Sequence, residues 1–270
     1  MARTARLARA PLPRLLAVPG ILALLFLVLP LAALVARVEW RTLWADVTTP
    51  AAVSALGLSL GTALVATLLC VVVGVPLAIL IARARSSVAS VLRVLVTIPL
   101  VLPPMVGGVA LLFLYGGSSP VGEWLDRAGL ALPFTTAAVV MAQVFVALPF
   151  LVISVEGAVR TAGTDYERTA AALGAGRWMT LRRVTLPLAA DGIVAGVILC
   201  FARAIGEFGA TALFAGNAPG VTQTMPLAIY TAFNGSGIGQ GPAVALALLL
   251  LVTVLVVLLV VRGWRPGRMS

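Results

Sequence analysis

The chain has 270 residues, of which 61% are hydrophobic and only 10% are charged. Soluble domains carry about 25% charged residues, so this composition excludes an ordinary soluble protein and indicates an integral membrane protein. All 19 basic residues are arginines, and the absence of lysine and histidine excludes a G-x-x-x-x-G-K-[ST] phosphate loop, a Ser-His-Asp triad and an H-E-x-x-H metal site.

Charge-free runs predict six membrane-spanning helices, because about 20 apolar residues cross a bilayer. A signal peptide is the alternative for the first run, but its apolar part is too long and no A-x-A cleavage site follows it. The third run contains three prolines, Pro99, Pro103 and Pro104, which kink transmembrane helices. The predicted spans lie near residues 15–36, 56–82, 92–115, 136–155, 189–214 and 243–262.

The arginines predict the orientation of these spans. The N-terminus, the 83–93 loop, the 156–187 loop and the C-terminal tail hold 15 of them, whereas the opposite loops hold three. Cytoplasmic loops carry an excess of positive charge, so both termini are expected in the cytoplasm. Because the arginines cluster between hydrophobic runs, they indicate membrane topology and not a nucleic-acid partner.

Two further features of the apolar segments bear on packing. Cys70 and Cys200 both lie in apolar runs, and we interpret them as small buried hydrophobic residues. The predicted external loop at 216–241 carries no charge and is rich in Gly, Pro and Thr. We expect this loop to pack against protein or to line an entrance.

The cytoplasmic loop between the fourth and fifth spans is the most informative part of the chain. Thr164, with Glu167 three residues later, has the pattern of a capping box and predicts the start of a short helix. Ala170, Ala171 and Gly174 then share a helix face with Glu167. Because the side chains on this face are small, another protein could approach it closely.

The stretch ERTAAALGAGRWMTLRRVTLP resembles the EAA loop of ABC-importer permeases, E-x-A-A-x-x-L-G followed by the proline of an L-P pair. Thr169 stands where that family usually has alanine, and Ala171 lies within the same loop. The resemblance implies that the loop forms a coupling helix that docks on a separate ATPase subunit, which binds ATP and Mg²⁺. For Glu167, helix capping alone stays open as an alternative. The matching residues are Glu167, Ala170, Leu173, Gly174, Leu186 and Pro187.

Arg203 and Glu207 interrupt the fifth apolar run. A charge at the bilayer centre costs roughly 2.5–3.5 kcal/mol, so both side chains should face the bundle interior and pair with each other. Their spacing of four residues places them on one face of a helix. Two interpretations stay open: an ion pair that fixes helix packing, or an element of a permeation path. Gly206 and Gly209 permit close helix contact or bending beside them.

The stretch FARAIGEFGATALFAGN resembles the A-R-x-x-G-E-F-G-A-T segment of oxyanion permeases, the branch that carries molybdate, tungstate and sulfate or thiosulfate. IPLVLPPMVGG and TMPLAIYTAF resemble the molybdate members more closely than the sulfate members. The resemblance covers about residues 50–262 and implies an all-α integral membrane fold of the type I ABC importer permease, with six transmembrane helices and a cytoplasmic coupling helix. It also implies a gate near Pro99, Pro103 and Pro104, for which packing geometry alone stays open as an alternative. It further implies a translocation pathway along Arg203, Gly206, Glu207, Gly209 and Thr211.

These observations predict a cytoplasmic tail at 1–14, an additional first helix at 15–37, a permease domain at 50–262 and a second tail at 263–270. The expected function is that of the membrane subunit of an ATP-driven oxyanion importer, for molybdate or tungstate, in the cell membrane of a prokaryote. Its expected partners are membrane lipid, a second copy of the chain, two ATPase subunits and an extracytoplasmic oxyanion-binding protein. The subunit itself would make or break no bond.

There are three alternatives to this function. A sulfate or thiosulfate importer stays open, because all these substrates are tetrahedral dianions. An ion-coupled secondary carrier would typically contain inverted repeats, and none is evident in the sequence. A membrane-embedded enzyme would need a nucleophile-base pair or paired intramembrane aspartates, neither of which is present in the sequence.

Overall fold

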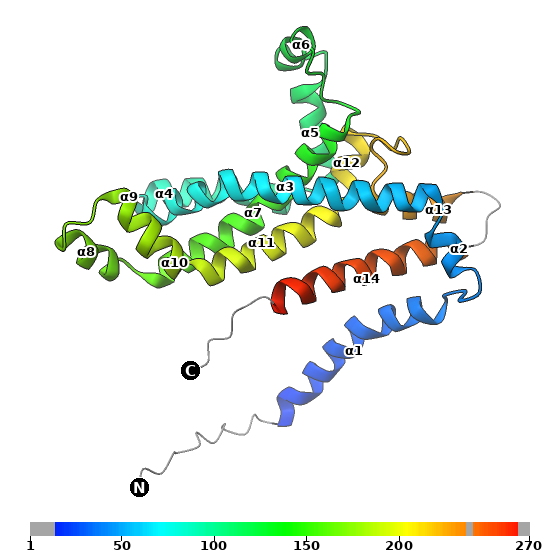
Figure 1. Ribbon diagram of the computed structural model, residues 1–270, viewed down its shortest axis with the longest axis horizontal. Helices are drawn as coiled ribbons and strands as arrows, with labels where there is room; N and C mark the ends of the chain where they lie inside the picture. Colours follow the sequence, from blue (N-terminus) through cyan, green and yellow to red (C-terminus); the bar gives the residue numbers. More distant parts are fainter. Residues whose placement is uncertain (1–13, 236–239, 264–270) are drawn as a thin grey trace.

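The computed structural model describes residues 14–235 and 240–263, and every regular element in this part of the chain is helical (Figure 1). The predicted tails lie outside the described residues apart from Arg14 and Gly263. The helices are α1 (Arg14–Ala36), α2 (Leu43–Val47), α3 (Pro50–Arg83), α4 (Ser86–Val101), α5 (Pro104–Tyr115), α6 (Pro120–Arg127), α7 (Thr136–Ala162), α8 (Asp165–Ala172), α9 (Arg177–Thr180), the π-helical turn η1 (Leu181–Thr185), α10 (Leu186–Leu188), α11 (Ala190–Ile205), α12 (Gly209–Phe214), α13 (Met225–Asn234) and α14 (Gly241–Gly263).

The described helices agree with the predicted number of spans. Four of them, α1, α3, α7 and α14, are individually long and apolar enough to cross a membrane. Two bent pairs add one span each: α4 with α5, at 110°, and the 177–188 segment with α11, at 68°. Counted in this way, the described part of the chain has up to six spans.

Two of the predicted spans are not continuous helices: the third has the kink that its prolines predict, whereas the fifth was predicted as one helix and in this respect the prediction was wrong. The third span breaks between Val101 and Pro104, where the α4 and α5 axes diverge by 110°. The fifth span breaks after Ile205 and resumes at Gly209. In the third span the cause is the Pro103–Pro104 pair, because proline disfavours helical conformation in the residue before it and cannot donate a backbone hydrogen bond.

Helices α3, α7 and α11 form the core, which consists mainly of small residues. Gly192 and Gly196 are four residues apart on α11, the spacing that lets transmembrane helices approach closely. An ideal Cβ on Gly192 would lie 2.2 Å from the Cβ of Ala158 on α7. The hydroxyl of Ser154 donates a hydrogen bond to the Gly192 carbonyl at 2.9 Å, which satisfies a polar group inside this contact. Cys70 and Cys200 are fully buried in the same core, as predicted.

The predicted external loop contains a helix, α13, that packs against α3 and α14. Its first residue, Met225, is buried, and the Met225 amide donates a hydrogen bond to Ser59 Oγ on α3 at 2.6 Å. The expectation that this loop packs against protein is therefore confirmed for its described part; residues 236–239 lie outside it. By contrast, α1 lies beside α14 at the edge of the molecule, and none of its most apolar stretch is buried (Figure 1).

Candidate functional site

Arg203 and Glu207 form the predicted ion pair, with 2.5 Å between Arg203 Nη2 and Glu207 Oε2. The prediction that they share one helix was wrong, because α11 ends at Ile205 and Glu207 lies in the break before α12. The glutamate side chain is 1% exposed and the arginine side chain 24% exposed. A buried carboxylate in such a position is tolerated only with a close counter-ion and further hydrogen bonds.

The second carboxylate oxygen of Glu207 supplies such a hydrogen bond. The Ala210 amide donates to Glu207 Oε1 at 2.8 Å, so the side chain caps the first turn of α12. One carboxyl group thus holds the guanidinium at the end of α11 and the first turn of α12. The break in the fifth span is therefore an ordered junction built on a single side chain.

The break in the third span lies against this junction. Pro103 precedes α5, and Pro104 is its first residue, where the missing N–H has no cost. Pro99 lies inside α4 and does not coincide with the bend. Of the three predicted kink residues, the structure therefore places two at the kink.

A cavity of about 300 Å³ lies where the two breaks meet. It brings together most residues of the predicted gate and pathway, together with Met105 and Phe208, which the sequence did not single out. Thr211 does not line it: the residue is fully buried on α12, and its hydroxyl has no hydrogen-bond partner among the described residues. The lining residues are Pro103, Pro104, Met105, Arg203, Gly206, Glu207, Phe208 and Gly209.

Glycines permit the close approach of the two broken spans. An ideal Cβ on Gly108 of α5 would lie 2.8 Å from the Ala210 carbonyl oxygen and 2.9 Å from the Ala210 Cα. An ideal Cβ on Gly209 would lie 3.1 Å from the Met105 amide nitrogen. Helices α5 and α12 can therefore pack as one unit beside the cavity only while Gly108 lacks a side chain.

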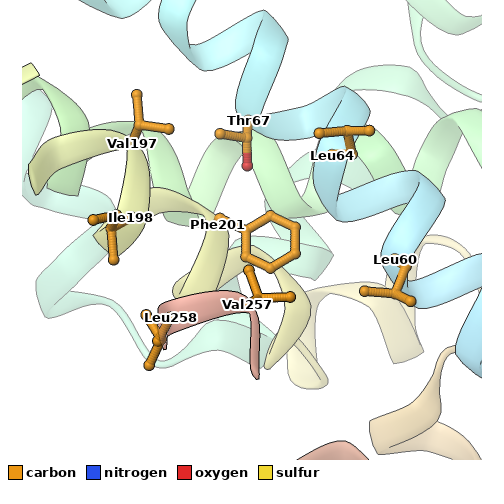
Figure 2. A pocket seen from close by; sticks show the side chains of 8 residues that line it. All are labelled: Leu60, Leu64, Thr67, Val197, Ile198, Phe201, Val257 and Leu258. Carbon is orange, nitrogen blue, oxygen red and sulfur yellow. The ribbon is translucent and has the colours of Figure 1, made fainter. Parts of the chain in front are cut away.

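A second cavity, between α3, α11 and α14, differs in chemistry (Figure 2). Figure 2 shows Phe201 among leucine and valine side chains, and Thr67 carries the only oxygen among the labelled sticks. The Thr67 hydroxyl is already bonded to the Ala63 carbonyl at 2.7 Å. A dianion would find no donor here, so the charged cavity at the two breaks is the better candidate for the pathway.

The predicted cytoplasmic loop folds into α8, α9, η1 and α10 at one end of the molecule (Figure 1). Gly174 ends α8 in the left-handed conformation, with φ of 84°. The Ala175 amide donates to the Ala170 carbonyl at 3.0 Å and the Gly174 amide to the Ala171 carbonyl at 3.0 Å, which is a Schellman motif. Helix α8 therefore ends before this glycine, and the prediction that Gly174 shares a helix face with Glu167 was wrong.

The predicted capping box is absent. Thr164 precedes α8 but makes no side-chain capping hydrogen bond. Glu167 instead pairs with Arg83 at the end of α3, at 2.5 Å, and accepts a hydrogen bond from Thr185 Oγ1 at 2.6 Å. The sequence missed Arg83 and Thr185 because their partner is 84 and 18 residues away, and no local pattern encodes that contact.

The other predicted loop residues, at the same end of the molecule, differ in exposure. Leu173 is 84% exposed, and Thr169, Ala171, Gly174 and Pro187 are also exposed. Ala170 and Leu186 are half-buried. Pro187 lies in the short helix α10, before the 68° bend into α11, and so precedes the fifth span by a few residues.

Sequence comparison places these features in a known group. Residues 74–267 match the family model described as binding-protein-dependent transport system inner membrane component. The chain belongs to this family. The predicted domain bounds of 50–262 and the predicted roles of individual residues stay predictions.

Curated relatives carry names from the same group. The molybdenum transport system permease protein ModB of Mycobacterium tuberculosis is 52% identical over 219 residues, which cover 81% of this chain and 83% of that protein. The probable molybdenum ABC transporter permease protein of Haloferax volcanii is 40% identical over 80% of this chain and 77% of its own length. The sulfate transport system permease protein CysT of Escherichia coli is 35% identical over 76% of each chain.

Solved structures share the fold at low identity. A bacterial ABC transporter involved in the import of the acidic polysaccharide alginate matches with a TM-score of 0.74 and 16% identity, over 95% of this chain and 96% of that chain. The MetNI methionine ABC transporter in an inward-facing conformation matches with a TM-score of 0.62 and 19% identity, over 78% of this chain and 94% of that chain. The chain therefore has the fold of ABC importer permeases.

Proposed function

We propose that the chain is the membrane permease subunit of an ATP-driven ABC importer that carries an oxyanion, with molybdate as the substrate. The observation that carries the proposal is the cavity at the two helix breaks, where Arg203 is the one cationic side chain among the lining residues. A guanidinium is a suitable partner for a tetrahedral dianion, because it donates two parallel hydrogen bonds to oxyanion groups.

The choice of molybdate rests on the relatives. The mycobacterial relative at 52% identity is named a molybdenum permease, whereas the sulfate permease CysT is 35% identical. Tungstate has the same shape and charge as molybdate and is proposed as a second substrate. Sulfate and thiosulfate are the alternative substrates, and the experiment below discriminates between them.

The proposed mechanism uses differences in affinity and no covalent chemistry. Glu207 neutralises Arg203 in the structure, so an arriving anion competes with this carboxylate for the guanidinium. Nucleotide-driven movement of a partner ATPase would open the cavity to one side of the membrane and then to the other. ATP and Mg²⁺ bind to that partner.

The partners follow from the same proposal. Two copies of this chain would form the pathway between them, and α8 of each copy would dock on one of two ATPase subunits. An external binding protein would deliver the anion; the alginate transporter was solved in complex with a periplasmic protein bound to an alginate pentasaccharide. The arginine distribution supports an orientation in the inner membrane with both termini and α8 in the cytoplasm.

The test is ATPase activity of the complex reconstituted with its ATPase and binding protein. We expect molybdate and tungstate to stimulate hydrolysis in the presence of the binding protein, and sulfate to have no effect. Stimulation by sulfate alone would assign the chain to the alternative. Absence of stimulation by any of the three oxyanions would refute the proposed function.

A further inference from the structure

A short helical segment precedes the fifth span. Residues 177–188 form α9, η1 and α10, and α11 begins at Ala190, after a single intervening residue. The axis of this segment lies at 68° to the axis of α11. Because α11 crosses the membrane, the segment at its end turns toward the membrane plane and lies beside the membrane surface. Figure 1 shows it between α11 and α8, which lies at the far end of the molecule.

One face of the segment packs against the rest of the molecule. Thr185 is buried, and Leu181 and Val184 are half-buried. The Thr185 hydroxyl donates a hydrogen bond to Glu167 Oε1 at 2.6 Å. Arg177 lines an internal cavity together with Leu181 and Thr185. The contacts that hold the segment therefore use this inner face, and the described part of the chain leaves the opposite face uncovered.

The uncovered face carries two apolar side chains and two arginines. Trp178 and Met179 are 71% and 50% exposed. Arg182 and Arg183, each four residues farther along, lie on the same face and are exposed as well. These four side chains line a pocket of about 410 Å³. The pocket thus offers cationic donors and apolar contact area side by side.

The π-helical turn η1 helps to bring the two arginines to one pocket. Arg182 and Arg183 lie within this turn, in which the Leu186 amide bonds to the Leu181 carbonyl. With hydrogen bonds between residues five apart, each residue of a π-helix turns through a smaller angle than in an α-helix, so consecutive side chains point in more similar directions. Single π-helical turns inside helices also occur frequently at functional sites.

The charge of the pocket calls for an anionic ligand. Neither Arg182 nor Arg183 forms an ion pair within residues 14–235 and 240–263. The segment 177–188 has three arginines and no acidic residue. A guanidinium donates two parallel hydrogen bonds to a phosphate group, and basic residues at the membrane surface attract anionic lipids.

The apolar half of the pocket favours a lipid over a soluble anion. Tryptophan is enriched at membrane–water interfaces, where its ring lies at the level of the headgroups. A helix that lies in the interface with arginine and tryptophan side chains binds anionic lipids through charge and buried apolar area together. A free phosphate would contact the arginines and leave Trp178 and Met179 exposed to water. A protein docked on α8 would lie farther from the membrane than this pocket (Figure 1).

We propose that Trp178, Met179, Arg182 and Arg183 form a binding site for an anionic phospholipid of the cytoplasmic leaflet. The lipid phosphate accepts hydrogen bonds from the two guanidiniums, and the glycerol and the first methylene groups pack on Trp178 and Met179. The inference goes beyond the proposed function and shares with it only the orientation in the membrane. The site requires neither an oxyanion substrate nor ATP.

The test measures lipid binding to the purified permease in detergent by native mass spectrometry, with phosphatidylglycerol and phosphatidylcholine as probes. We expect wild type to bind phosphatidylglycerol in preference. The double variant Arg182→Gln with Arg183→Gln should weaken phosphatidylglycerol binding about tenfold or more and leave phosphatidylcholine binding unchanged.

The matched control removes the same charge from the same end of the molecule. It is the double variant Arg85→Gln with Arg177→Gln, because neither residue lines the pocket and neither forms an ion pair in the described ranges. This control should bind phosphatidylglycerol as wild type does. Equal losses in the two double variants would show that binding follows the overall charge of this end, and the inference would be wrong.

Trp178 gives an independent arm. Trp178→Ala should weaken phosphatidylglycerol binding, whereas Trp178→Phe keeps an aromatic ring and should retain most of it. Trp124→Ala is the control, because Trp124 is similarly exposed, at 65%, and lies outside the pocket. The melting temperature without added lipid should stay near that of wild type in every variant, since the exchanged side chains are exposed. Equal binding by Trp178→Ala and Trp124→Ala would remove the lipid-specific part of the proposal.

Two further outcomes would assign the pocket to another ligand. Displacement of phosphatidylglycerol by inorganic phosphate would identify a site for a free anion. Loss of ATPase co-purification in Arg182→Gln with Arg183→Gln, with lipid binding unchanged, would identify a protein-docking surface. None of these measurements depends on stimulation of ATPase by an oxyanion, so failure of the proposed function and failure of this inference are distinguishable.

Discussion

The carboxylate of Glu207 pairs with Arg203 through one oxygen, at 2.5 Å, and caps α12 through the other, by way of the Ala210 amide at 2.8 Å. The two contacts have different chemical requirements. The ion pair needs the negative charge, whereas the cap needs only an acceptor oxygen. Substitutions at Glu207 can therefore separate the role of charge in this junction from the role of helix capping.

Glu207→Gln should destabilise the permease, and Glu207→Ala should destabilise it further. Removing one partner of a fully buried ion pair costs about 3–5 kcal/mol, and the glutamine variant should lose less because a quarter of the Arg203 side chain is exposed. Loss of the cap adds about 1 kcal/mol in the alanine variant. Thermal unfolding in detergent measures both effects. The double variant Arg203→Gln with Glu207→Gln removes both charges and should be more stable than Glu207→Gln alone; a double variant of equal or lower stability would contradict the ion-pair interpretation.

Arg203 should be required for transport beyond its contribution to stability. We expect Arg203→Gln to reduce molybdate uptake into proteoliposomes about tenfold or more, because hydrogen bonds to charged groups contribute about 1.5–3 kcal/mol. Arg203→Lys keeps the charge without the bidentate geometry and should give intermediate uptake. If the glutamine variant assembles and transports at the wild-type rate, the arginine has only a packing role.

The sequence predicted the spans well because their signal is local and strong. Apolar runs between arginine clusters predicted the membrane helices, and α1, α3, α7 and α14 agree with them. The pairing of Arg203 with Glu207 was also predictable, since two intramembrane charges four residues apart have few other ways to be satisfied.

The break in the fifth span was harder to predict because its cause lies partly in tertiary contacts. Gly206 and Gly209 are compatible with a continuous or a broken helix, and the packing of α12 on α5 through Gly108 accompanies the broken form. The capping box failed for a related reason. Glu167 has a cation within reach at Arg83, and its ion pair with Arg83 draws the carboxylate away from the backbone N–H at the start of its own helix. Sequence spacing does not show that competing partner.

Gly192→Ala should destabilise the core although alanine is the better helix former. Its Cβ would lie 2.2 Å from the Ala158 Cβ, so α7 and α11 would have to separate, and such overpacking typically costs about 1–3 kcal/mol. Gly61→Ala on α3 is the matched control, because no atom lies within 4 Å of the added Cβ. The control should be neutral or more stable by up to about 1 kcal/mol. Equal melting temperatures for the two variants would show that this close contact does not hold α11 in place.

Gly108→Ala should impair transport through the packing of the two broken spans. The added Cβ would meet backbone atoms of Ala210 at 2.8 and 2.9 Å, and backbone cannot move aside as a flexible side chain can. Helices α5 and α12 would therefore separate beside the cavity that contains Arg203, at a cost of about 1–3 kcal/mol in stability. Molybdate uptake should fall while the ATPase still co-purifies, because α8 lies at the other end of the fifth span. Gly57→Ala, with open space around its Cβ, is the control and should transport as wild type does. If Gly108→Ala melts and transports like this control, α5 and α12 do not act as one unit, and the gate must be sought away from the two breaks.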